Sequence, residues 1–411
     1  MSLRNRTSTR ALWLAAGVAG AGISTSILLA CATDGPAPAG EAPPQGATLP
    51  SADGGGDGNA IDVADVADAA CDDCEYFPAT CEADTLCTTG PFDPALPGGA
   101  FDVRTRINVI RGRSASDVWV AGTAGAIAHF DGTSWTLSAS GTQETLSALW
   151  LADGMEMAFG RPELLVTRGI DVPDAGVSPG GWSSHAPASI ASSYERPAKT
   201  FESAWAAPGA EWLWVASRPA KESDTVDGIW RMHRSAASGQ FELDNGVNLP
   251  VAVTGVTGVH SSSADVLWAV GDNGLAVRVT GADGDQPACE MFNSQTWNGL
   301  RGVWAASDAE AWAVGGRGTI RRYVGSGSDW DVVSDVPTNH HLNAVWGTSS
   351  SDIWAVGEGA VVLHYDGARW SRVKIAGLGP RRPDLYTVWT AAPGHVWIGG
   401  HGVFFSLGGK P

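Results

Sequence analysis

Residues 344–357 read AVWGTSSSDIWAVG and place two tryptophans, Trp346 and Trp354, eight positions apart. Apolar residues flank each tryptophan, and small polar residues with one aspartate separate them. Short apolar runs bounded by Gly, Ser and Asp are typical of strands joined by a tight turn. The stretch therefore predicts two adjacent strands, each anchored by one large aromatic side chain.

The same pattern recurs along the chain. Two close copies are LRGVWAASDAEAWAVG at 300–315 and LYTVWTAAPGHVWIGG at 385–400. Weaker copies begin at residues 107, 146, 201 and 256, where Arg111 and His260 replace the first tryptophan of the first and fourth units. The second anchors of the seven units are Trp119, Met157, Trp214, Trp268, Trp312, Trp354 and Trp397, separated by 38, 57, 54, 44, 42 and 43 residues.

A period near 43 residues built from short apolar runs is the length of four strands with their turns. Helical solenoids of similar period need long runs of helix-forming residues, which the repeats lack. Asp131–Gly132 and Asp366–Gly367 supply hairpin turn chemistry before a last strand. The sequence therefore predicts an all-β fold, a seven-bladed β-propeller of four-stranded blades spanning residues 98–411.

Fourteen of the 19 tryptophans fall at three repeat positions, so we expect them to fill the wedges between blades rather than to line a ligand groove. The seventh unit ends at FFSLGGKP without a fourth strand. Because an open ring leaves sheet edges unpaired, we expect residues 98–106 (GGAFDVRTR) to supply that strand.

These units resemble the WD40/YVTN/BNR-like seven-bladed propellers of bacterial surface lipoproteins and, more distantly, photosystem assembly factor propellers. The resemblance covers about residues 100–408 and implies the fold much more than an activity. Sialidase-type BNR propellers carry S-x-D-x-G-x-x-W, whereas HFDGTSW and HYDGARW have one residue fewer between Asp and Trp. This departure weakens any transfer of sialidase chemistry to this chain.

A sialidase would need a tyrosine nucleophile and an arginine cluster. Tyr386 and Arg301 both occupy the second position of a predicted inner strand, where side chains point toward the channel mouth. The other second-position residues are Asn108, Ser147, Glu202, Thr257 and Asn343. We therefore keep a glycan-active enzyme, a sialidase-like hydrolase or a lyase, as the alternative to a binding module.

Turns at one end of the channel predict a binding face, because loops on a rigid scaffold commonly carry function. The candidates are Arg317, Glu358, His401, Asp272, Asn273, Arg301, Asn343 and Tyr386. An ordinary solvated rim is the competing interpretation. No catalytic residue, metal site or cofactor is indicated, since HExxH and related motifs are missing from the sequence.

The amino terminus predicts export. Residues 1–30 combine a basic start, an apolar stretch and a final LLA before Cys31, which resembles a bacterial lipoprotein signal peptide. The resemblance implies that Cys31 carries lipid, although Leu29 is larger than the residue usual there; an ordinary secretory peptide and an uncleaved anchor are the alternatives. Residues 31–70 are rich in Pro, Gly and Asp and predict a disordered tether.

Residues 71–97 contain four closely spaced cysteines, Cys71, Cys74, Cys81 and Cys87. Outside the cytoplasm this density favours disulfides over zinc, with three pairings open. Cys289 is then either a free thiol or a partner for one of the four. The sequence thus predicts a small disulfide-rich segment before the propeller.

The formal charge of −18 argues against nucleic acid as a partner, because phosphate binding needs clustered Lys and Arg. Taken together, the sequence predicts a monomeric, lipid-anchored module of the bacterial cell envelope that binds or scaffolds a protein or a glycan. Ala32 gives no aspartate retention cue after the lipid cysteine, so we expect the outer membrane.

Overall fold

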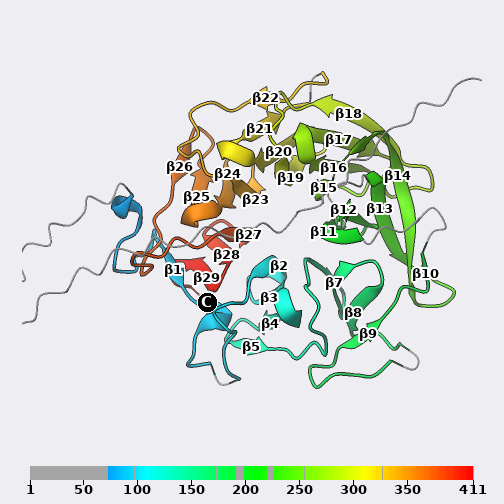
Figure 1. Ribbon diagram of the computed structural model, residues 1–411, viewed down its shortest axis with the longest axis horizontal. Helices are drawn as coiled ribbons and strands as arrows, with labels where there is room; N and C mark the ends of the chain where they lie inside the picture. The colour runs from blue at the N-terminus through cyan, green and yellow to red at the C-terminus, as the bar shows by residue number, and fades with distance from the viewer. Residues whose placement is uncertain are drawn as a thin grey trace, which may run out of the picture. The chain divides into compact units, whose positions relative to one another are not determined.

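The computed structural model describes residues 73–96, 98–172, 175–190, 199–219, 226–253, 255–325 and 327–410, all within one compact unit (Figure 1). The predicted signal peptide, Cys31, the tether and Cys71 lie outside the described residues. Within these ranges no helix has the length and apolar character needed to cross a membrane. The described chain forms strands and short 3-10 turns, and its strands make seven sheets.

The seven sheets are the predicted blades. Blades 1 and 2 contain β2 (Ile107–Ser114), β3 (Asp117–Gly122), β4 (Ile127–Phe130), β5 (Trp135–Leu137), β6 (Ala148–Ala152), β7 (Met155–Arg161), β8 (Leu164–Arg168) and β9 (Ser183–His185). Blades 3 and 4 contain β11 (Lys199–Trp205), β12 (Leu213–Pro219), β13 (Val226–Arg234), β14 (Phe241–Val253), β15 (Val256–Ser261), β16 (Val266–Gly271), β17 (Leu275–Thr280) and β18 (Ala288–Asn293). Blades 5 and 6 contain β19 (Leu300–Ser307), β20 (Glu310–Gly315), β21 (Ile320–Tyr323), β22 (Asp331–Val332), β23 (Leu342–Ser349), β24 (Asp352–Gly357), β25 (Val362–Tyr365) and β26 (Trp370–Arg372).

Blade 7 is built from both ends of the described chain. Its strands are β27 (Leu385–Ala392), β28 (His395–Gly400), β29 (Val403–Leu407) and β1 (Leu86–Thr88). In β1, Leu86 is paired antiparallel with Leu407 and is fully buried. The expectation that residues 98–106 close the ring is therefore wrong. The closing strand comes from inside the cysteine-rich segment, where LCT is apolar enough to cover the exposed edge of β29.

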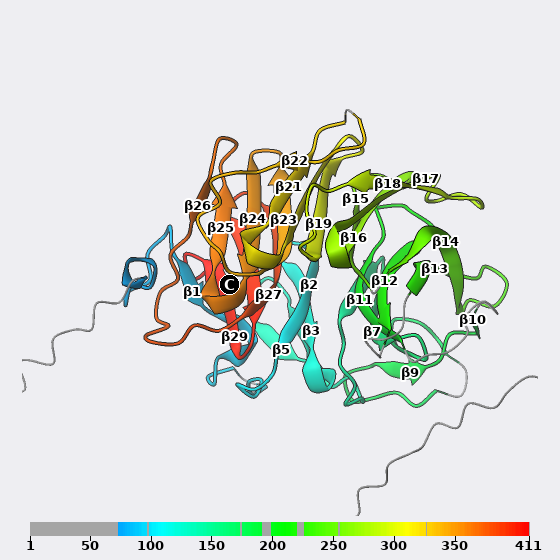
Figure 2. The same ribbon diagram turned by 45° about the horizontal axis from the view of Figure 1, so that its top comes forward.

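The blades surround a central channel, and their first strands lie nearest to it (Figures 1 and 2). Each of β2, β6, β11, β15, β19, β23 and β27 contacts the first strand of the next blade, and β27 contacts β2. Blade 3 also has a two-residue parallel strand, β10 (Ser189–Ile190), on its outer edge. Apart from β10, the architecture matches the predicted seven blades of four strands.

The tryptophan pair that suggests the repeat is a cross-strand pair. Trp346 lies directly opposite Trp354 in the ladder of β23 and β24. In the other blades the pairs are Arg111–Trp119, Trp150–Met157, Trp205–Trp214, His260–Trp268, Trp304–Trp312 and Trp389–Trp397. All seven second anchors are buried. The predicted units are thus confirmed in register, including those in which Arg111 and His260 replace tryptophan.

An aspartate two residues before the second tryptophan orients that side chain. In β24, Asp352 Oδ1 accepts hydrogen bonds from Trp354 Nε1 at 3.0 Å and pairs with His364 Nε2 at 2.8 Å. The His364 ring stacks on Trp354, with 4.3 Å between ring centroids. The indole N–H of this buried ring is therefore satisfied, and the aspartate in the SSSDIW turn has a structural role.

Blade 1 repeats this arrangement with Asp117, Trp119 and His129. Asp117 also forms an ion pair with Arg113 at 3.0 Å. Burial raises the pKa of the Asp117 carboxyl, but hydrogen bonds from His129 and Arg113 outweigh it, so that the pKa lies below its ordinary value. The ionised carboxylate is therefore the form that the folded blade stabilises.

The cysteine-rich segment is joined to blade 7. Cys81 forms a disulfide with Cys87, the middle residue of β1, and Cys74 is also disulfide-bonded, as predicted for an exported chain. Cys289 is a free thiol on β18, which selects one of the two possibilities that the sequence leaves open. Asp73 accepts two hydrogen bonds from Arg382, a residue of the loop before β27. The segment is thus fastened to the propeller by a strand and an ion pair.

We predict that Leu86→Ala destabilises the propeller by about 2–5 kcal/mol, because it leaves a cavity in the closing strand. Chemical denaturation of the full chain should show this loss. The matched control is Val103→Ala, in the segment 98–106, whose side chain is 65% exposed and whose loss should change stability by no more than about 0.5 kcal/mol. Equal effects of the two changes would contradict the assignment of the closing strand.

We predict that Asp117→Asn lowers the free energy of unfolding at pH 7 by about 1–3 kcal/mol, since it removes a charge-assisted hydrogen-bond acceptor. A lowered native pKa stabilises the fold above the ordinary pKa of aspartate, and this stabilisation is lost as the pH falls through the native value. The difference from wild type should therefore shrink as the pH falls below about 4, the ordinary pKa of aspartate. Denaturation curves between pH 7 and pH 3 test this, with the exposed Asp331→Asn as the control that should be silent.

Candidate functional site

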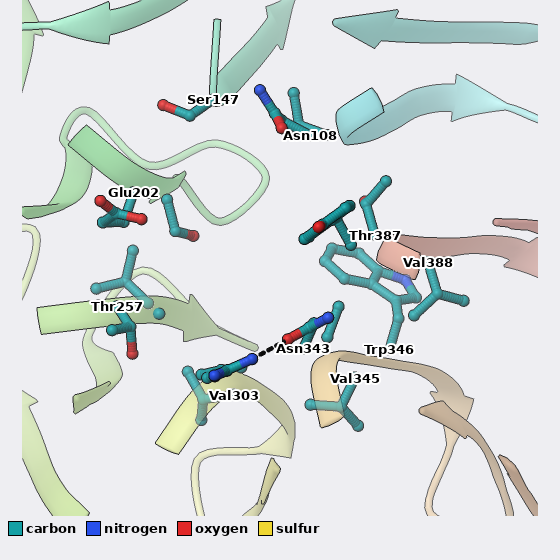
Figure 3. Close-up of a pocket in the computed structure, with 18 of the residues that line it drawn as sticks. Asn108, Ser147, Glu202, Thr257, Val303, Asn343, Val345, Trp346, Thr387 and Val388 are labelled. Carbon is teal, nitrogen blue, oxygen red and sulfur yellow. Dashed lines mark hydrogen bonds between the residues drawn. The ribbon is translucent and has the colours of Figure 1, made fainter. Parts of the chain in front are cut away.

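One end of the channel is lined by the residue at the second position of every repeat unit, as the sequence predicts. In six of the units the strand ladder skips this residue, and such a β-bulge re-aims the side chain that it carries. The seven side chains surround a pocket of about 100 Å³ (Figure 3). They are Asn108, Ser147, Glu202, Thr257, Arg301, Asn343 and Tyr386.

Several of these side chains tie one blade to the next. Asn108 Nδ2 donates to the carbonyl of Leu146 at 2.9 Å, and Asn343 Nδ2 donates to the carbonyl of Leu385 at 2.8 Å. Thr257 Oγ1 donates to Leu300 O at 2.6 Å, and Ser147 Oγ likewise donates to Phe201 O. Each acceptor is the first residue of the next unit, so a shared polar position joins neighbouring inner strands at the channel mouth.

Two arginines at the mouth already have partners. Arg301 Nη1 forms an ion pair with Glu358 Oε1 at 3.0 Å and donates to Asn343 Oδ1 at 2.6 Å. Arg106 lies over the Tyr386 ring, 4.7 Å from its centroid, and donates to Asn108 Oδ1. The structure thus joins Arg301, Asn343 and Glu358 in one hydrogen-bonded network, whereas Tyr386 contacts Arg106.

Glu202 differs from the other charged groups at the mouth. Its side chain is exposed toward the pocket (Figure 3), and Oε1 accepts a hydrogen bond from Thr200 Oγ1 at 3.1 Å. Within the described part of the chain it makes no ion pair. A solvent-accessible carboxylate without a cation can accept a basic or N–H-bearing group from a ligand.

The predicted rim residues lie at the same end of the channel. The turns η5 (Gly316–Gly318) and η6 (Glu358–Ala360) follow the second strand of their blades, and each is hydrogen-bonded to the residue just before its own inner strand. Those bonds run from Gly316 N to Gly299 O and from Glu358 N to His341 O. Arg317 is exposed at a φ of 55°, in the left-handed region. Its side chain is therefore held out into solvent by the turn.

The remaining candidates are spread around this rim. Asn273 is exposed in the turn η4 (Asp272–Gly274), whereas Asp272 forms an ion pair with Arg218 at 2.7 Å. His401 is exposed on blade 7 beside Asp384, whose carbonyl accepts its N–H. The eight candidates thus share one end of the propeller, and three of them, Arg301, Asn343 and Glu358, form one contact network.

An exposed tryptophan on the same rim was not among the predicted residues. Trp297 is 88% exposed and lies four residues before Arg301, in the loop that leads into β19. The same loop contacts η4, since Gly274 lies against Thr296 O. It also reaches η5, where Gly316 lies between Asn298 and His341. The sequence could have indicated that Trp297 is exposed, because this tryptophan stands outside the three repeat positions, in the polar stretch NSQTWNG.

The floor of the pocket is a cluster of first anchors, the residues at the first tryptophan position of each unit. Trp205 stacks on His260 with 4.3 Å between ring centroids, and Trp346 meets both rings edge-on. His260 Nδ1 accepts a hydrogen bond from Ala305 N, and burial, with the nearby charge of Arg111, lowers the pKa of His260 well below its ordinary value. The ring is therefore neutral at physiological pH, and the cluster blocks the channel.

No set of three His, Cys, Asp or Glu side chains in the described ranges is placed to hold a metal ion. The mouth offers hydrogen-bonding groups, one accessible carboxylate, an Arg–Glu pair and an exposed indole. These groups are suited to holding a polar, partly apolar ligand by non-covalent contacts.

Comparison with models of protein families found no match, and comparison with curated proteins found none either. Solved structures share the fold. YCF48 bound to D1 peptide is 15% identical, with a TM-score of 0.54 over 81% of this chain and 97% of that one. The WD40 β-propeller domain of Doa1 is 11% identical, with a TM-score of 0.56 over 80% and 97%.

Virginiamycin B lyase from Staphylococcus aureus is 14% identical, with a TM-score of 0.55 over 74% of this chain and 94% of that one. At such identities the comparisons establish the propeller fold alone. Propellers of this shape thus include one solved with a peptide and one named as a lyase, so the fold does not choose between binding and catalysis.

We predict that Thr257→Val, which preserves shape and removes the inter-blade hydrogen bond, destabilises the protein by about 1–3 kcal/mol because the Leu300 carbonyl loses a buried donor. Thermal and urea denaturation measure the loss. Thr280→Val, at an exposed position of β17, is the matched control and should change stability by less than about 0.5 kcal/mol. A silent Thr257→Val would show that the hydrogen bonds between blades contribute nothing to stability.

Proposed function

We propose that this protein is a binding module that holds an extended, basic protein segment across the channel mouth. The observation that carries the proposal is the accessible carboxylate of Glu202, which has no cationic partner in the described chain, inside a mouth built by all seven blades. A chain with a formal charge of −18 also favours basic over acidic partners.

Trp297 supplies the apolar part of the same site. An exposed tryptophan is rare on a soluble surface, and tryptophan is enriched among residues that dominate binding energy. It stands on the rim beside the turn that carries Arg317, so a segment lying over the mouth can contact the indole and the carboxylate at once. The peptide bound to the similarly folded YCF48 supports a protein segment as the partner class.

The proposal includes a lipid anchor in the bacterial cell envelope, on the outer membrane. Its support is the signal-like segment 1–30 ending before Cys31, together with the Cys81–Cys87 disulfide expected of an exported protein. A tether of residues 31–70 would let the propeller search for partners near the membrane surface. Metabolic labelling with a palmitate analogue, lost on Cys31→Ala, tests this part separately.

Selection of a random dodecapeptide library on the full-length chain in detergent tests the binding site. We expect peptides enriched in Lys and Arg, whose affinity falls at least tenfold, about 1.4 kcal/mol, on Glu202→Gln and again on Trp297→Ala. Fluorescence anisotropy with a labelled peptide measures the affinities.

Matched controls distinguish the mouth from general surface charge. Glu290→Gln and Val332→Ala alter an exposed carboxylate and an exposed apolar residue on outer strands, and both should leave affinity unchanged. Peptides without basic residues, or binding insensitive to Glu202→Gln, would contradict the proposal. A glycan bound and returned cleaved, with turnover lost on Tyr386→Phe or Arg317→Ala, would establish the enzymatic alternative instead.

A further inference from the structure

Arg111 is the one first anchor that carries a permanent charge, and no carboxylate of the described chain neutralises it. The guanidinium lies over Trp346, 4.8 Å from the ring centroid, and 5.6 Å from that of Trp205. Its Nη1 donates to the neighbouring Ile110 carbonyl. Its Nε is buried and makes no hydrogen bond, and no carboxylate of the described chain pairs with the group. Burial alone lowers the pKa of Arg111 to about 10.

Two other arginines of the fold have more partners than Arg111. Arg113, two residues along the same strand, forms ion pairs with Asp117 and Glu156 at 3.0 and 2.8 Å. Arg321 donates to three backbone carbonyls. A buried charge is costly unless it is paired and hydrogen-bonded. Arg111, by contrast, has no ion pair and donates a single hydrogen bond among the described residues.

A cavity of about 520 Å³ leads to Arg111 from the end of the channel opposite the mouth. Its walls include three first anchors, Trp150, Trp205 and Trp389, and the other lining residues include Leu149 and Ala210. Trp150 and Trp205 are only partly buried, so these two repeat tryptophans pack against the core and also expose ring surface to the cavity. The cavity combines indole surfaces with the unpaired guanidinium of Arg111, and Arg113, which Asp117 and Glu156 neutralise, and Asp153 also line it.

We propose that this cavity binds a small monocarboxylate with a flat aromatic body, the carboxylate facing Arg111 and the ring lying among the tryptophans. The planar guanidinium matches a carboxylate in two parallel hydrogen bonds, and indole surfaces pack well against aromatic rings. A doubly charged phosphate is disfavoured, because a single unneutralised arginine would leave half its charge buried. Arg111 also lines the mouth pocket, but this proposal does not rest on the peptide site proposed there.

Isothermal titration of the full-length chain in detergent with 2-naphthoate, and with the neutral 2-naphthamide, tests the proposal. We expect saturable one-site binding of naphthoate and at least tenfold weaker binding of the amide. Arg111→Met should abolish the preference for the carboxylate. The variant should fold, since removing an unpaired buried charge relieves desolvation, and its melting temperature should be equal or higher.

Two further variants complete the test. Ala210→Trp, which adds bulk to the cavity wall, should also weaken naphthoate binding, whereas Arg104→Met, at an arginine with an 86% exposed side chain, should have no effect. Peptide binding at the mouth should persist in Ala210→Trp, because Ala210 lines this cavity and not the mouth pocket, which separates failure of this proposal from failure of the first. Equal affinity for acid and amide, retained binding by Arg111→Met, or no saturable binding by wild type would each overturn it.

Discussion

The cross-strand contact between the first and second anchors of each unit is the interaction on which the propeller depends. A strand shifted by one residue would turn every side chain to the opposite face. Pairing Trp346 with Trp354 holds β23 and β24 in register, and the buried indole of Trp354 is fixed by Asp352 and His364. Once this register is set, the bulged second residue is the one left to face the channel.

The two ends of the channel differ because different positions of the repeat unit line them. The second residue of each unit lines the mouth, and the first anchor lines the opposite end. At the mouth, small polar side chains such as Asn108 and Thr257 donate hydrogen bonds to the next blade. The same repeat position therefore both stabilises the ring and lines the pocket. At the other end, large rings meet across the channel and leave a cavity. One charged replacement there, Arg111, converts packing surface into a charged site because no carboxylate of the described chain pairs with it.

Closure of the ring explains why the cysteine-rich segment is part of the fold. Without β1, blade 7 would have three strands and would expose the edge of β29 to other chains. The pairing of Leu86 with Leu407 covers that edge, and the Cys81–Cys87 disulfide with the Asp73–Arg382 ion pair holds the short strand in place. The chain therefore enters the propeller at the blade that also contains its last strand.

The sequence by itself determined the all-β class, the seven units and their register, because aromatic periodicity and turn residues are local properties. It even assigned Arg111 and His260 to tryptophan positions and placed the second-position residues at the channel mouth. Only the tertiary structure decided which segment closes the ring, since three apolar residues in a loop resemble many others until the open edge is seen. Likewise, only the fold showed that Glu202 and Arg111 have no counter-ion among the described residues and that Trp297 is exposed. Charge balance and exposure depend on residues distant in sequence, and a local pattern does not encode them.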